Sequence, residues 1–228
     1  MRKLLVPLAL SLGAMLSVVQ ADDKDNQPPP AATQAALRTP QALELRDAMR
    51  KLWEEHIQYT RNFIISTLGN LQDQKAVTER LLKNQDDIGN AIKPYYGDEA
   101  GQKLTKLLRD HILIAADVVK AAKANNKKTL AKQQERWSTN GKEIASFLAA
   151  ANNSWQEKDL EAMLQKHLDL TTGEVVGRLT KDWQKDIDSY DAGHAHMLMF
   201  ADALTEGIVK QFPNKFGGKQ PAAARMSH

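Results

Sequence analysis

Three histidines recur in the sequence at a nearly constant interval. His56, His111 and His167 lie in the similar segments LWEEHI, LLRDHI and MLQKHL, and they are 55 and 56 residues apart. Each is surrounded by apolar residues at helical spacing, so each imidazole is expected on the inward side of a helix. An imidazole can bind a metal ion or make hydrogen bonds, so three of them brought together would form a site.

A second set of polar residues follows the same interval. Asn84, Asn140 and His196 are 56 residues apart, and each follows one of the three histidines by 28 or 29 positions. The two sets together predict a 56-residue repeat of a helical hairpin, present three times, with one inward polar residue on each helix.

The spacing also predicts where these side chains lie. In an antiparallel hairpin, residues equally far from the turn lie at the same height. The midpoints of the three pairs fall near residues 70, 125 and 181, and Gly69-Asn70 and Asn125-Asn126 are typical turn sequences. We therefore expect the six residues to form one layer across the bundle, to within about one helical turn of roughly 5 Å.

Three interpretations of this layer remain open. It can be a buried polar layer that fixes helix register, since imidazole and carboxamide groups satisfy each other's hydrogen bonds. It can be a metal site, or a pocket for a small organic molecule. For the metal site, which suits copper or zinc, the predicted ligands are His56, His111, His167 and His196. Four further side chains are predicted to support those ligands: Asn84, Asn140, Asp87 and Glu143.

Several enzyme classes are excluded by missing motifs. The sequence has no cysteine, no GxGxxG, no P-loop and no HExxH. Asp191 and His194 are spaced to pair on one helix, but no serine nucleophile accompanies them in sequence. No catalytic residue is predicted, and a binding protein or a structural module of the cell envelope is favoured over an enzyme.

The elements that must position the layer are all helical. Residues 39–213 are predicted to form an all-α, up-and-down bundle of about six helices. Thr39-Pro40 is typical of a helix start, Pro94 and Gly97 predict a break, and Ser154 with Glu157 predicts a capping box. Phe212-Pro213 is expected to end the last helix. No alternating apolar pattern predicts a strand.

The two ends of the chain differ from the bundle in composition. Residues 1–21 have a basic start and an apolar run before Val19-Gln20-Ala21, which predicts a signal peptide and a periplasmic or secreted protein without a stable membrane anchor. Residues 22–38, with three consecutive prolines, are predicted to be a disordered linker, and 214–228 a flexible tail. Without Arg2 and Lys3, 29 basic residues face 28 acidic ones, so nucleic acid is not an expected partner. The composition does not define an oligomeric state.

Four segments resemble a known group of sequences: WEEHIQYTRNFIIS, TERLLKNQDDIGNAIKPYYG, HILIAADVVKAAKA and YDAGHAHMLMFADALTEGIVKQFP. Over residues 45–213 the chain resembles a family of short, exported, all-helical bacterial proteins of unknown function. Some members are labelled glycosyltransferase or acetylglutamate kinase. Those labels imply α/β folds with nucleotide-binding loops, and this sequence has neither predicted strands nor such loops. The resemblance implies export and one helical domain, and it implies no catalytic residue.

The signal-peptide prediction has a direct test. The protein recovered after export from a bacterial host is expected to begin at Asp22, because the small-x-small sequence ending at Ala21 is a cleavage site. Intact-mass spectrometry of the exported product measures this. A product that retains residues 1–21 would contradict the prediction.

Overall fold

The structure of the chain is a computed structural model that describes residues 31–217. The predicted signal peptide, most of the predicted linker and residues 218–228 of the predicted tail lie outside these residues. The elements in chain order are α1 (Ala31–Ala36), α2 (Pro40–Gly69), α3 (Gln74–Lys123), α4 (Lys127–Ala151), α5 (Glu157–Thr180), α6 (Trp183–Gln211) and the short 3-10 helix η2 (Pro213–Phe216). No strand occurs among the described residues, so the predicted all-α fold is confirmed.

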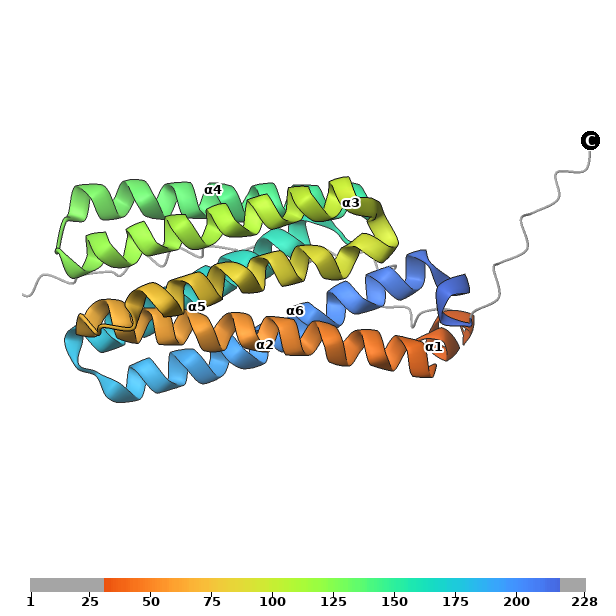
Figure 1. The fold of residues 1–228 in the computed structure, drawn as a ribbon, viewed down its shortest axis with the longest axis horizontal. Coiled ribbons are helices and arrows are strands. Elements are labelled where there is room, and N and C mark those ends of the chain that lie inside the picture. The colour runs from red at the N-terminus through yellow and green to blue at the C-terminus, as the bar shows by residue number, and fades with distance from the viewer. Residues whose placement is uncertain (1–30, 218–228) are drawn as a thin grey trace, which may run out of the picture. The chain divides into compact units, whose positions relative to one another are not determined.

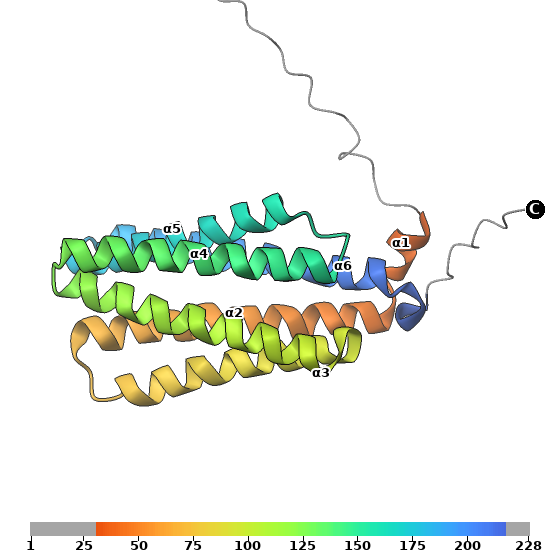
Figure 2. The same ribbon diagram turned by 90° about the horizontal axis from the view of Figure 1, so that it is seen from above.

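Element α3 consists of two antiparallel helices. Gly97 interrupts it with φ 85° and ψ 170°, a backbone conformation that favours glycine. We call residues 74–96 α3N and residues 98–123 α3C. Figure 2 shows the chain reversing direction between them. The helix continues through Pro94 as far as this glycine, so the break lies at the predicted turn near residue 97 and not at the proline.

The helices pack in a closed ring. Helix α2 packs against α3 and α6, α3 packs against α4, α4 against α5, and α5 against α6, as Figure 1 shows. Short turns connect successive helices, so neighbours are antiparallel. A smaller contact joins α2 to α5 across the ring. This contact brings the first and third predicted histidine helices together.

The ends of the helices follow specific side chains. Asn70 and Asn125 end α2 and α3 with φ near 50°, in the left-handed region that asparagine tolerates. Thr39, Asn126 and Asp182 each accept a hydrogen bond from a backbone N–H in the first turn of the following helix. The capping box predicted at Ser154 and Glu157 is wrong. Helix α5 begins only at Glu157, and the Ser154 N–H is bonded to the Asn152 side chain in the preceding turn.

The packed region extends slightly beyond the predicted bundle at both ends. Ala36 of the segment predicted as a linker is buried, and Phe216, beyond the predicted end of the bundle at residue 213, is 2% exposed. Phe216 stacks on Tyr95 at the end of α3N, where the ring centroids are 5.9 Å apart. Helix α1 contacts η2 and α6 at this same end of the bundle. None of the described helices is long and apolar enough to cross a membrane.

The reversal at Gly97 brings two glycines into close contact. A Cβ atom on Gly89 would lie 2.7 Å from the backbone oxygen of Gly101 and against the side chain of Thr105. Backbone cannot move aside as a flexible side chain does, so α3N and α3C approach this closely only because both positions lack a side chain.

Gly89→Ala is therefore expected to destabilise the protein by about 1–3 kcal/mol, the usual cost of forcing extra volume into a packed core. Gly141→Ala is the matched control, because that helical, buried position has no atom nearer than 3.9 Å to the new Cβ. The control should be neutral or gain up to about 1 kcal/mol from helix propensity. Denaturant unfolding measures both changes. Equal stability of the two variants would contradict the close packing.

Candidate functional site

The three predicted histidines meet in the interior of the bundle. His56 on α2, His111 on α3C and His167 on α5 are each no more than 3% exposed. The His167 ring lies 5.5 Å from the His56 ring and 6.1 Å from the His111 ring, measured between centroids. His167 is thus in ring contact with both of the other two.

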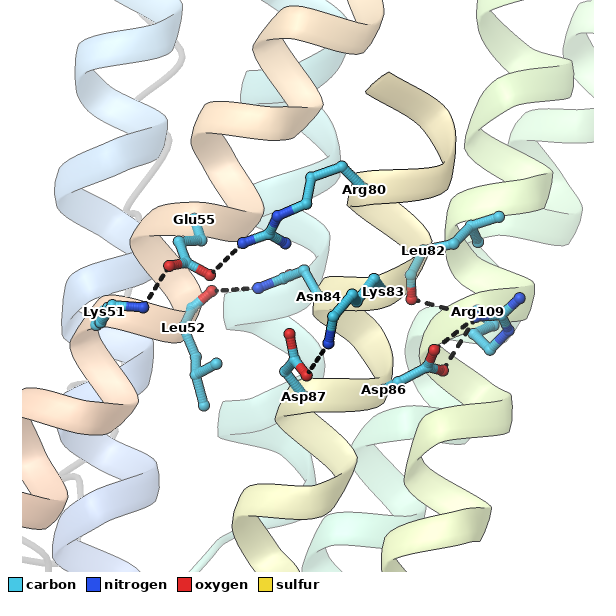
Figure 3. Close-up of polar contacts among 10 residues, drawn as sticks. All are labelled: Lys51, Leu52, Glu55, Arg80, Leu82, Lys83, Asn84, Asp86, Asp87 and Arg109. Atoms are coloured by element: carbon cyan, nitrogen blue, oxygen red, sulfur yellow. Dashed lines mark hydrogen bonds and ion pairs between the residues drawn. The ribbon is translucent and has the colours of Figure 1, made fainter. Parts of the chain in front are cut away.

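The second set of polar residues makes the same hydrogen bond at three places. Asn84 donates to the Leu52 carbonyl at 2.9 Å, and Asn140 donates to the Leu107 carbonyl at 3.1 Å. His196 Nε2 donates to the Met163 carbonyl at 2.7 Å. Each acceptor lies four residues before one of the three histidines. Figure 3 shows Asn84 reaching from α3N to the Leu52 carbonyl on α2. We refer to these six residues as the polar layer.

His111 uses both of its ring nitrogens. The Trp137 indole N–H donates to His111 Nε2 at 3.0 Å, and an indole nitrogen is only ever a donor. His111 Nε2 is therefore unprotonated. The proton lies on Nδ1, which donates to the Asn140 side-chain oxygen at 2.7 Å. These two contacts fix His111 as a neutral ring in one orientation.

His56 is held through one ring nitrogen by a residue that the spacing analysis missed. The Gln85 amide contacts His56 Nδ1 at 3.3 Å and also donates to the Leu81 carbonyl and to the Asn84 side chain. Gln85 is fully buried beside Asn84, and Trp137 lies three residues before Asn140. Trp137 shares a helical face with Asn140, since residues three apart are neighbours on a helix, whereas Gln85 does not share one with Asn84.

His167 differs from the other two histidines. Neither of its ring nitrogens has a hydrogen-bond partner among residues 31–217, and Nδ1 is closed off completely. His196, its partner in the predicted pattern, bonds to the Met163 carbonyl and is only half-buried. Leaving a buried polar group without a partner costs roughly 1–3 kcal/mol, so this ring marks a position where the interior is not satisfied by the chain itself.

All three rings are held neutral by their surroundings. Burial lowers the pKa of His56 to about 3, and charge on His111 acts in the same direction. Burial lowers the pKa of His111 to about 4 against the opposing effect of its hydrogen bond to Asn140. Burial and the neighbouring His56, His111 and His196 lower the pKa of His167 well below 6.5. Among residues 31–217, no carboxylate acts on any of the three rings to stabilise a positive charge.

A cavity of about 90 Å³ adjoins the three histidine rings. It lies between the polar layer and the end of the bundle that carries the turns at Asn70, Asn125 and Lys181. Apart from the histidines, its walls are mostly apolar side chains of α2, α3, α4 and α5, including Phe63, Ile64, Leu81, Val118, Val119, Leu130, Trp137 and Val175. No Asp, Glu, Lys or Arg side chain lines it.

The predicted metal ligands are not arranged as a metal site. Among residues 31–217, no group of three or more His, Asp or Glu side chains could hold a metal ion. The lone pair of His111 Nε2 is taken by Trp137, and His196 Nε2 is bonded to a carbonyl. Asp87 pairs with Lys83 at 2.8 Å on the flank of α3N, as Figure 3 shows, and Glu143 is exposed. Copper or zinc binding thus stays a prediction without a donor set in this arrangement.

A buried charge cluster lies at the same end of the bundle as the cavity. Arg61 of α2 donates to Glu174 of α5 and to Asp186 of α6, each at 3.0 Å, and Arg178 also contacts Asp186. Burial raises the pKa of Glu174 to about 7, and the charge on Asp186 adds to this effect, while Arg61 opposes it. The charges are paired within the cluster, which ties α2, α5 and α6 together.

Comparisons with protein-family models, with curated proteins and with solved structures gave no match to this chain. The site is therefore interpreted from its own geometry.

The neutral histidines predict a loss of stability in acid. Their folded pKa values lie below the unfolded value of about 6.5, so below that pH the unfolded chain binds more protons and stability falls. The three histidines together give a slope of at most about 4 kcal/mol per pH unit. Glu174 acts in the opposite direction between pH 4.5 and 7, because its raised pKa makes the folded state bind about one more proton than the unfolded state. The expected net slope is roughly 1–3 kcal/mol per pH unit between pH 6.5 and 4.5.

Urea unfolding at several pH values measures this slope. In parallel, the ring resonances of His56, His111 and His167 in the NMR spectrum should stay constant between pH 8 and 5. A ring of this group that titrates near pH 6.5, or stability that is independent of pH in this window, would contradict the neutral, buried layer.

Proposed function

We propose that this chain is an exported, non-catalytic binding protein that holds a small, largely apolar organic molecule in the cavity beside the three histidines. The observation that carries the proposal is the cavity itself. Its walls are mostly apolar, carry no charged side chain and include the buried ring of His167, which lacks a hydrogen-bond partner among residues 31–217. Ligand pockets are typically apolar concavities with a few oriented polar groups.

The size of the cavity limits the ligand. An engineered apolar cavity of about 150 Å³ is known to bind benzene or xenon. The cavity here is about 90 Å³, which favours a molecule of no more than about one six-membered ring. Export rests on the predicted signal peptide, and it would give the protein access to small molecules outside the cytoplasm.

The second candidate function is a structural or interaction module of the envelope. It is supported by the three hydrogen bonds of Asn84, Asn140 and His196 to carbonyls of the preceding helix, which would fix register in a protein without any ligand. This interpretation explains the bonded part of the polar layer. It does not explain why the ring of His167 has no partner beside an apolar cavity.

Thermal melts of the full chain with one-ring compounds test the proposal. A ligand at one hundred times its dissociation constant stabilises the folded state by about 2.7 kcal/mol. At least one compound, drawn from a panel with and without polar groups, is expected to raise the melting temperature. Zinc, copper, nickel and cobalt at neutral pH are expected to leave it unchanged, because His111 and His196 already use the nitrogens that a metal would need.

Val119→Phe fills the cavity and should abolish the ligand effect, since Val119 is one of its walls. Leu113→Phe is the matched control on the same helix, because Leu113 is 50% exposed and lies outside the cavity. A wild type that responds to no compound and is stabilised by Val119→Phe would favour the structural module. Stabilisation of the wild type by one of the metals would support the metal site predicted from the sequence.

A further inference from the structure

The cavity is not uniformly apolar, because the Thr60 hydroxyl group and two ring nitrogens on its walls have no hydrogen-bond partner among residues 31–217. His56 contacts Gln85 through Nδ1, and its Nε2 atom has no hydrogen-bond partner among the described residues. The His167 Nδ1 atom is enclosed, whereas its Nε2 atom is neither hydrogen-bonded nor fully enclosed. Both rings line the cavity. His111 also lines it, but both of its nitrogens are engaged by Trp137 and Asn140.

The two rings are close enough to share one ligand atom. The ring centroids of His56 and His167 are 5.5 Å apart and both rings line the cavity, so one hydroxyl group beside them would lie near both rings. Such an oxygen would accept from an Nε2 atom that carries a proton. If the oxygen carries a hydrogen, it can donate to an Nε2 atom that does not. A hydroxyl group has both capacities.

We infer that the ligand is a neutral molecule with one apolar ring and one hydroxyl group, of which phenol is the simplest example. This inference rests on the proposed function and specifies its ligand class. The ring occupies the apolar part of the cavity, and the hydroxyl group lies between His56 and His167. The binding requires no covalent step and no co-reactant.

The walls select against the alternatives. A carboxylate or an ammonium group would lose its hydration beside walls that contain no Asp, Glu, Lys or Arg, which is costly without a charged partner. A ring without a polar group would fill the same space, but it would leave the nitrogens of His56 and His167 unsatisfied. The chain therefore distinguishes ligands of the same shape by their hydrogen bonding.

Isothermal titration of the full chain with phenol, benzene and benzoate at neutral pH tests the inference. Phenol is expected to bind about tenfold more tightly than benzene, which is the usual worth of one or two neutral hydrogen bonds, and benzoate more weakly than either. His167→Leu should reduce the preference for phenol over benzene to about twofold or less while benzene still binds. His194→Leu is the matched control, since His194 lies on α6 outside the cavity and should leave the preference intact.

NMR of the ring nitrogens keeps the test independent of whether the variant folds. In the wild type, phenol should shift the Nε2 resonances of His56 and His167 more than those of His111, whose nitrogens are occupied by Trp137 and Asn140. Equal affinity for benzene and phenol, tighter binding of benzoate, or shifts confined to His111 would overturn the inference while the proposed function stands. If no one-ring compound of any kind binds, the proposed function itself fails.

Discussion

The contact on which the bundle depends is a side chain of one helix bonded to a carbonyl of the preceding helix. In an α-helix, the carbonyls of Leu52, Leu107 and Met163 also accept the backbone N–H of the histidine four residues later. One oxygen atom therefore holds both the histidine and the polar residue opposite it. Sliding either helix along the other by one turn would break the cross-helix bond and strand a buried polar group. The height of the three imidazoles is set in this way, and the cavity lies directly beside them.

The three histidine rings of the polar layer differ in how many hydrogen-bond partners they have. The rings of His56 and His111 are each held by an amide from the next helix, and Trp137 completes the shell around His111. His167 has only ring contacts. A layer that served register alone would gain stability from a partner for His167, or from an apolar residue in its place. An unsatisfied ring beside a cavity is therefore consistent with the binding function proposed above.

The main features of the fold followed from the sequence, because turn chemistry and helical period are local properties. Asn70 and Asn125 end helices as predicted, and the spacing of the histidines placed them together. Other features depend on packing between distant segments. Ile187 of α6 is apolar but 46% exposed, since α6 turns that face to solvent. Gln85 and Trp137, which contact His56 and His111, were not predicted, because the 56-residue spacing does not include them. A cavity cannot be predicted at all from periodicity, because it is the space that imperfectly matched side chains leave unfilled.

The two ends of the described chain leave the bundle on one side. Helix α1 contacts η2 and α6 beside Gly97, and Figure 1 shows both at the end away from the turns at Asn70, Asn125 and Lys181. The cavity lies in the opposite half. A tether, a fused reporter or an immobilising surface joined to the bundle at residue 31 or residue 217 would therefore lie at the end away from the cavity. Tandem fusion or surface display through that end of the bundle would therefore not approach the histidines.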